Sequence, residues 1–186
     1  MEDKKYFSRQ IDESLMAWKN STRHKPLLLR GARQVGKSSS VRHLAEQFDY
    51  FVEINFERKP AYLEIFKGDR DAKHIVEMIK SITGEPIVPG KTLLFFDEIQ
   101  MCQEAISSLR FFWEDMPGLH VIAAGSLLEF ALSEIPTFGV GRIHSMFMYP
   151  MSFDEFLNAL GMFSLQKYKR EASPETVSYT HLTLPT

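Results

Sequence analysis

The stretch Gly31-Ala32-Arg33-Gln34-Val35-Gly36-Lys37-Ser38 decides the fold of this 186-residue chain, and an apolar run, residues 27–29, precedes it. The eight residues match the pattern G-x-x-x-x-G-K-[ST], which is typical of a phosphate-binding loop. Glycines at both ends allow the backbone to curl so that successive N–H groups point at phosphate oxygens. A helical pattern follows, and the N-terminus of that helix would add its dipole to the same anion site. Strand, loop and helix therefore predict one anion-binding unit.

The side chains of this loop carry separate expected roles. Lys37 would place a cation at the β- and γ-phosphate oxygens of a nucleotide, and the Ser38 hydroxyl would serve Mg²⁺. Arg33 is either a phosphate contact or a solvated side chain. An ordinary glycine turn is the alternative, which the flanking strand and helix disfavour. The expected phosphate contacts are Gly31, Ala32, Arg33, Gln34, Val35, Gly36, Lys37, Ser38 and Ser39.

The composition favours a globular domain and argues against several other classes of protein. With 44% hydrophobic and 25% charged residues, the chain is long enough for one well-packed domain. No apolar run reaches the roughly 18 residues of a membrane span, and residues 1–6 lack a signal-peptide core, so a cytoplasmic location is expected. The net charge of −2 gives no general attraction to nucleic acid. Cys102 is the single cysteine, which excludes an internal disulfide, and no two histidines have metal-ligand spacing.

Apolar residues repeat with helical spacing on both sides of the loop. Ile75, Val76, Ile79 and Ile82 are expected on one buried face of a helix that begins near Asp71. The patterns of the first half predict helices over residues 7–20, from the loop to about 48, over 60–66 and from 71 to about 83, and strands over 27–30 and 50–56.

The second half alternates in the same way. Residues 93–96 are an unbroken apolar run, which is typical of a strand buried on both faces of a parallel sheet. Ser152 and Glu155 form a capping box that begins a final helix, with Phe156, Leu157 and Leu160 expected to point inward. Further strands are predicted over residues 119–124 and 143–149, helices over about 106–116 and 127–132, and a loop over 135–141. The alternation predicts an α/β fold with a doubly wound parallel sheet.

Two acids end the buried strand at residues 93–96. Asp97 would reach the water shell of the Mg²⁺ held by Ser38, and Glu98 would polarise an attacking water. An acidic pair that merely caps a strand at the surface is the alternative. In doubly wound sheets ligands sit at the carboxyl ends of the strands, where the loop, Asp97 and Ser126 would meet.

GARQVGKS, LLFFDEIQ and AAGS, in this order, resemble Walker A, Walker B and sensor 1 of the AAA+ ATPase superfamily. The chain is most similar to a prokaryotic branch of uncharacterised ATPases with an R-Q-x-G-K-[ST] loop, an F-D-E-I-Q strand end and a G-S sensor. Members of that branch also carry a later G-R followed by P-[LM]-S-F-x-E-F, present here as Gly141-Arg142 and residues 150–156. The likeness covers about residues 7–160.

The resemblance implies a P-loop NTPase three-layer sandwich whose five parallel strands have the order 5-1-4-3-2. It implies that Ser126 orients water or senses the γ-phosphate, and that Arg142 is an arginine finger that reaches a neighbouring subunit of a homo-oligomer. The helical lid of AAA+ proteins and the further C-terminal region of this branch are missing. The expected organisation is an N-terminal helix and lead-in at residues 1–25, an ATPase core at 26–161 and a tail at 162–186.

Three functions remain open at this point. The leading hypothesis is ATP hydrolysis coupled to conformational change, with ATP and Mg²⁺ bound and with Glu98, Lys37, Ser126 and Arg142 as catalytic residues. A P-loop kinase acting on a small acceptor is the second. A nucleotide-gated switch without enzymatic activity is the third, and only the short cluster at residues 23–25 would suggest nucleic acid as its partner.

The C-terminal tail differs from the rest of the chain. It is polar from about Ser164 and shows no sustained apolar period. Its last ten residues, 177–186, resemble a translated sequencing-adapter read-through, so a truncated chain with an artefactual end is expected. An ordinary extended tail is the alternative.

Overall fold

The computed structural model describes residues 6–68, 71–126, 128 and 141–171. Two compact units make up the chain, Met1–Pro150 and Met151–Thr186, and each is treated separately below. The helix and loop predicted over residues 127–141 and the last fifteen residues fall almost entirely outside the described ranges. Within those ranges, no helix is long and apolar enough to cross a membrane.

A five-stranded parallel sheet is the centre of the first unit. Its spatial order is β2-β3-β4-β1-β5, which is the predicted 5-1-4-3-2 read from the other edge. The expected P-loop NTPase fold is therefore confirmed. The strands are β1 (Leu27–Arg30), β2 (Tyr50–Asn55), β3 (Thr92–Asp97), β4 (His120–Ala124) and β5 (His144–Phe147).

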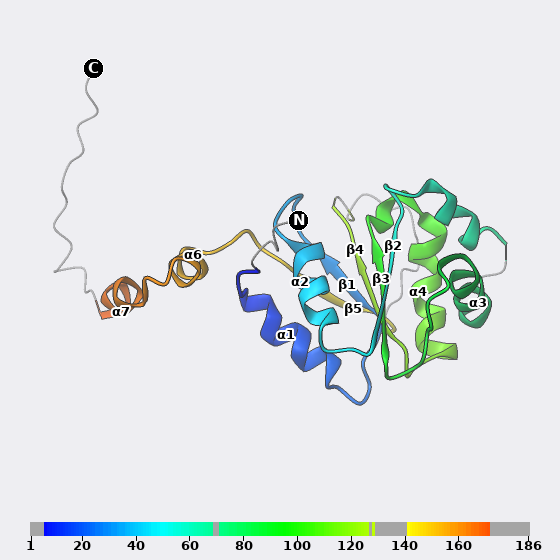
Figure 1. Ribbon diagram of the computed structural model, residues 1–186, viewed down its shortest axis with the longest axis horizontal. Coiled ribbons are helices and arrows are strands. Elements are labelled where there is room, and N and C mark those ends of the chain that lie inside the picture. Colours follow the sequence, from blue (N-terminus) through cyan, green and yellow to red (C-terminus); the bar gives the residue numbers. More distant parts are fainter. Residues whose placement is uncertain (1–5, 69–70, 127, 129–140, 172–186) are drawn as a thin grey trace, which may run out of the picture. The chain divides into compact units, whose positions relative to one another are not determined.

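Helices cover both faces of this sheet and make three layers (Figure 1). One face carries α1 (Gln10–Lys19) and α2 (Lys37–Ala45). The opposite face carries α3 (Ala72–Thr83), α4 (Gln103–Asp115) and the 3₁₀ helices η1 (Pro60–Phe66) and η2 (Ile99–Met101).

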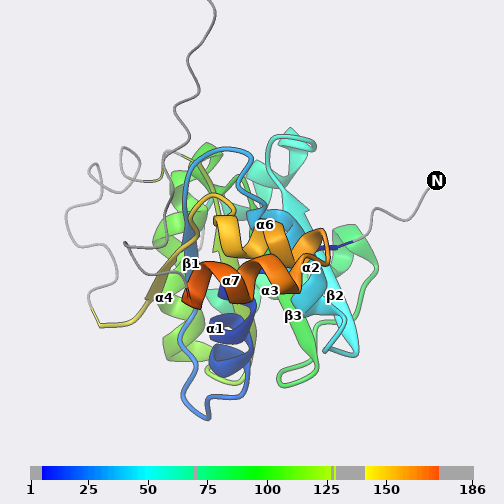
Figure 2. The same cartoon turned by 90° about the vertical axis from the view of Figure 1, so that its left-hand side faces the viewer.

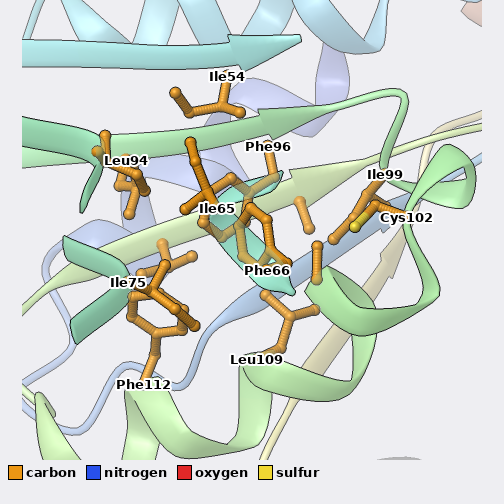
Figure 3. Close-up of a cluster of buried hydrophobic side chains, with 14 of the residues drawn as sticks. Ile54, Ile65, Phe66, Ile75, Leu94, Phe96, Ile99, Cys102, Leu109 and Phe112 are labelled. Carbon is orange, nitrogen blue, oxygen red and sulfur yellow. The ribbon is translucent and has the colours of Figure 1, made fainter. Parts of the chain in front are cut away.

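Strand β3 explains why the core has two halves. All six of its residues are buried, and successive side chains point to opposite faces of the sheet. Leu94 and Phe96 join the cluster under α3 and α4, which Figure 3 shows, whereas Leu93 and Phe95 join the cluster under α1 and α2. Phe96 meets Phe66 and Phe112 at ring-centroid distances of 5.5 and 5.8 Å, in the edge-to-face arrangement that aromatic rings prefer.

Helix α3 begins and ends where its sequence signals predict. The Asp71 carboxylate accepts hydrogen bonds from the backbone N–H groups of Lys73 and His74, and Gly84 ends the helix in the left-handed conformation. The expectation that Ile82 is buried was wrong, because its side chain is 51% exposed. Thr83, four residues after Ile79, is half-buried and lies nearer to the core-facing side of the helix.

The second unit consists of α6 (Phe153–Ala159) and α7 (Phe163–Glu171), drawn in orange in Figure 2. The predicted capping box is confirmed, since Ser152 and Glu155 exchange hydrogen bonds of 3.2 and 2.6 Å. Leu157 is buried as expected, but Phe156 and Leu160 are about half exposed, which corrects their predicted inward orientation. Two short helices offer too little surface to bury all three side chains. Helix α7 was not predicted, because its composition is polar.

Two histidines far apart in the sequence stack on each other at the amino edge of the sheet. The rings of His24 and His120 lie 3.7 Å apart at an angle of 7°, and Trp18 and Phe48 meet His120 edge-on. His120 Nε2 is 3.0 Å from the carbonyl oxygen of Lys19. Burial lowers the pKa of His120 to about 4. The hydrogen bond to the Lys19 carbonyl oxygen opposes this shift, and the charges of His24 and Lys19 add to it.

This pair predicts a loss of stability in mild acid. Between pH 6.5 and 4 the unfolded chain binds a proton at His120 that the folded chain excludes, so stability falls as the pH drops through this window. The expected loss at pH 5 is about 2 kcal/mol, measurable by urea unfolding at pH 7.5 and 5. A His120→Phe variant should lose much of this dependence, and replacement of the exposed His74 should not. Equal pH dependence in wild type and His120→Phe would contradict the prediction.

Candidate functional site

The carboxyl ends of four neighbouring strands meet at one edge of the sheet. Asp97 of β3 is in register with Ala124 of β4 and with Asn55 of β2, and Ala124 is in register with Leu29 of β1. The predicted phosphate loop begins two residues after Leu29, and Ser126 lies two residues after Ala124. The strand register therefore brings the loop, Asp97 and the start of the Ser126 turn to the same edge.

The loop between β1 and α2 has a backbone that only a few residue types tolerate. Gly31 and Gly36 have φ angles of +144° and +104°, and Gln34 has +63°. The hydrogen bond from Ser40 N–H to the Gly36 carbonyl is the first of the helical pattern of α2. The backbone N–H groups of residues 37–39 come before this bond and therefore have no carbonyl acceptor within the helix. They can bind an anion instead.

The Lys37 side chain folds back onto the start of the phosphate loop. Its Nζ donates hydrogen bonds to the carbonyl oxygens of Gly31 and Ala32 at 2.9 and 2.8 Å. Burial lowers the pKa of Lys37, while the charges of Glu98 and Asp97 oppose this shift. The ammonium group therefore lies between the loop and the two acids, where it could neutralise phosphate oxygens. Arg33, by contrast, is exposed and lies 3.7 Å from Glu57.

Ser38 and Asp97 are in direct contact, although 59 positions separate them. Ser38 Oγ lies 3.0 Å from each carboxylate oxygen of Asp97. Asn55 Nδ2 donates a second hydrogen bond of 3.0 Å to Asp97, and Arg42 lies 3.9 Å from it. Burial raises the pKa of Asp97, Glu53 and Glu98 raise it further, and the hydrogen bonds from Ser38 and Asn55 act against the increase.

These two side chains fit a magnesium ion by their chemistry. A hydroxyl and a carboxylate are hard oxygen ligands, and Mg²⁺ in nucleotide sites takes one or two protein carboxylates, substrate phosphates and water. The described residues contain no group of three or more His, Cys, Asp or Glu side chains placed to hold a metal ion. A site with few protein ligands, completed by phosphate, is the kind that Ser38 and Asp97 could form.

Glu98 follows Asp97 in a conformation that is unusual for a glutamate. Its φ is +53°, and together with Gln34 it is one of two non-glycine residues with positive φ in the described ranges. Such conformations cost roughly 1–3 kcal/mol and gather at functional sites. The Glu98 side chain is half-buried, and its Oε2 accepts a hydrogen bond of 2.6 Å from Gln100 Nε2.

Ser126 and Arg142, two further predicted site residues, lie at opposite ends of the strands. Ser126 is buried just beyond the end of β4, at the edge that carries the loop. Arg142 precedes β5 and lies at the amino ends of the strands, opposite the phosphate loop, because His144 is in register with Leu27, the first residue of β1. Its Nε lies 2.6 Å from Glu114 Oε1. The structure thus does not bring Arg142 to the phosphate loop of its own chain.

Sequence reasoning missed three side chains around the site. Asn55 and Arg42 flank Asp97, and the polar end of the strand beside β3 was a signal that could have identified Asn55. Arg9, before α1, donates hydrogen bonds to the carbonyl oxygens of Val35 in the loop and Tyr149 after β5, at 2.7 and 3.0 Å. No pattern links Arg9 to the loop, because these two bonds go to backbone atoms distant in sequence.

Gly31 is expected to tolerate no side chain. A Cβ at this position would lie 2.2 Å from the carbonyl oxygen of Met148, which is backbone and held by the Met148–Arg30 hydrogen bond. We expect Gly31→Ala to cost about 3 kcal/mol or more of stability and to distort the phosphate loop. Gly84→Ala is the matched control, because φ is also positive there but no atom lies within 4 Å. It should cost only about 1 kcal/mol in thermal or urea unfolding, and equal losses would contradict the prediction.

Comparison with known proteins shows the family to which this chain belongs. A family model described as an AAA domain matches residues 23–157, which is well over half of the chain and includes all five strands. Among curated proteins no match was found. The chain therefore belongs to the AAA domain family, with an AAA-type P-loop ATPase core and a nucleotide-binding, ATPase-like function.

Proposed function

We propose that this protein binds ATP with Mg²⁺ and hydrolyses the β–γ phosphate bond, with hydrolysis coupled to a conformational change. The contact between Ser38 and Asp97 carries the proposal. It joins the phosphate loop to the acidic end of β3 and brings two oxygen ligands together. When bound there, Mg²⁺ would offset negative charge on the β- and γ-phosphates.

Each residue of the site has one task in this proposal. The loop amides and Lys37 hold the phosphates, and Ser38 and Asp97 hold the metal ion. Glu98 accepts a proton from the attacking water, since its carboxylate lies next to Asp97 and close enough to influence the charge state of Lys37. Ser126, at the end of the adjacent strand, orients that water or contacts the γ-phosphate.

Phosphate release tests the proposal. We expect the protein to release inorganic phosphate from ATP in the presence of Mg²⁺, slowly where the helical lid is missing, and to stop when EDTA removes the metal. The assay contains no acceptor molecule, so release distinguishes hydrolysis from transfer by a P-loop kinase. Tight ATP binding without any release would instead favour the nucleotide-gated switch.

Arg142 is proposed to act on the nucleotide of a neighbouring copy. Its place at the edge opposite the loop, beside Glu114, supports action between subunits over action within one chain. A guanidinium supplied in this way can raise phosphoryl-transfer rates by orders of magnitude.

Mixing two inactive variants tests this role. Arg142→Ala leaves the phosphate site intact, and Lys37→Ala leaves Arg142 intact. We expect the mixture to hydrolyse ATP faster than either variant alone, because some sites then combine an intact loop with a neighbouring arginine. A mixture no faster than the sum of its parts would contradict action in trans.

A further inference from the structure

Gln100 connects the end of β3 to the end of β4. It lies in η2, two residues after Glu98, and its Nε2 donates a hydrogen bond of 2.6 Å to Glu98 Oε2. Its Oε1 lies only 2.1 Å from the point that a Cβ on Gly125 would occupy. Glycine at position 125 therefore leaves the space that the Gln100 amide fills.

Glu98 depends on this neighbour for its orientation. Among the described residues, Gln100 is the one hydrogen-bond donor to the Glu98 carboxylate. The Glu98 backbone is in the left-handed region, which fixes where its side chain begins. The side chain itself has three rotatable bonds. Without the amide, the carboxylate would be free to adopt several orientations.

The Gln100 amide has a cost as well as a hydrogen bond. Gln100 Oε1 is buried and has no hydrogen-bond partner within the described part of the chain. A buried polar atom of this kind costs about 1–3 kcal/mol. Methionine has nearly the same length and shape and would avoid that cost, but it would also lose the hydrogen bond to Glu98, so the unpaired oxygen accompanies the group that holds this carboxylate.

We propose that Gln100 is a positioning residue for ATP hydrolysis. Its amide holds Oε2 of Glu98 and leaves Oε1 to accept the proton of the attacking water. Its contact with Gly125 makes this orientation depend on the end of β4, next to Ser126. The inference rests on the proposed function, in which Glu98 is the base.

Gln100→Met isolates the hydrogen bond from the packing. The variant keeps the length of the side chain beside Gly125 and deletes the donor to Glu98. We expect kcat to fall about 10- to 100-fold, because small errors in the placement of a catalytic group have effects of this size. ATP affinity and KM should stay within about twofold, and the melting temperature should stay close to that of the wild type, because loss of the hydrogen bond to Glu98 and removal of the unpaired buried oxygen offset each other.

A double-mutant cycle tests the contact with Gly125. The methyl group of Gly125→Ala would meet Gln100 Oε1 at 2.1 Å, and Leu128 Cγ at 3.2 Å. We expect this variant to lower kcat because it displaces the amide from Glu98. In a Gln100→Ala background the overlap with the amide is removed and only the Leu128 side chain has to shift by a few tenths of an ångström, so adding Gly125→Ala should change kcat less than twofold. Equal effects of Gly125→Ala in both backgrounds would overturn the coupling.

The deciding experiment measures kcat, ATP affinity and melting temperature for the wild type, Gln100→Met, Glu98→Gln and the control Gln47→Met, an exposed glutamine after α2. A selective loss of kcat in Gln100→Met supports the inference. An unchanged kcat, or a loss that only accompanies lower ATP affinity or melting temperature, overturns it. If Glu98→Gln turns over at the wild-type rate, the proposed function fails at its base. If Glu98→Gln is inactive and Gln100→Met is normal, only this inference fails.

Discussion

Replacing Lys37 by alanine is expected to abolish measurable ATP binding. The change removes a buried ammonium that donates hydrogen bonds to the Gly31 and Ala32 carbonyl oxygens and would transfer them to phosphate. Each charge-assisted hydrogen bond contributes about 1.5–3 kcal/mol, so two of them correspond to at least a 100-fold increase in Kd. Titration calorimetry or a fluorescent ATP analogue measures this change directly.

Lys91→Ala is the matched control for this experiment. It deletes the same side chain just before β3, at the amino edge of the sheet, where Lys91 is exposed and 3.4 Å from Asp49. ATP affinity should stay within about twofold of wild type, because exposed ion pairs contribute little. Tight ATP binding by Lys37→Ala would remove the phosphate-loop interpretation, and with it the rest of the site.

Glu98→Gln is expected to keep ATP binding and to lose turnover. Glutamine has the size of glutamate, so the residue still fits its left-handed position and still offers an oxygen to Gln100. It cannot accept a proton from water, and a positioned general base contributes roughly 100- to 10,000-fold to the rate. We therefore expect kcat to fall at least about 100-fold while Kd for Mg·ATP changes less than threefold.

Single-turnover phosphate release and equilibrium ATP binding separate these two effects. Glu104→Gln is a suitable control, since Glu104 is exposed in the first turn of α4 and the substitution makes the same chemical change. Hydrolysis by Glu98→Gln at the parent rate would show that Glu98 is not the base. Loss of binding in that variant would show instead that Glu98 contributes to the nucleotide site itself.

Together the two variants examine different parts of the site. Lys37→Ala tests whether the loop holds phosphates, and Glu98→Gln tests whether bound ATP meets a base. A chain that loses binding in the first and turnover in the second behaves as an ATPase. A chain that loses ATP binding in the first variant and shows no turnover even as wild type behaves as a nucleotide-gated switch.

Local patterns were sufficient to predict most elements of this fold. The loop at residues 31–38, the four strands from β1 to β4 and the caps Asp71 and Ser152 each depend on neighbours within a few positions. Hydrophobic periodicity and backbone preference are local properties, so a single sequence displays them. The buried run at 93–96 also indicated a central strand, because only a strand covered on both faces is apolar throughout.

The predictions that failed concern how far along a helix the buried apolar face extends. Ile82 and Leu160 each follow a correct helical pattern and are nevertheless exposed. Periodicity states which direction a side chain points, but burial also needs a partner surface at that height along the helix. That surface belongs to other elements, so the pattern of one helix does not contain it.

The sequence by itself determined the phosphate loop, the alternation of strands and helices, and the acidic end of β3. Only the tertiary structure decided that Ser38 contacts Asp97, that Gln100 lies between Glu98 and Gly125, that His24 stacks on His120, and that Arg142 lies at the opposite edge of the sheet. The physical reason is that contacts between distant side chains depend on strand register and layer packing. Register is a collective result of burying the whole core, whereas a motif states only which chemical groups are available.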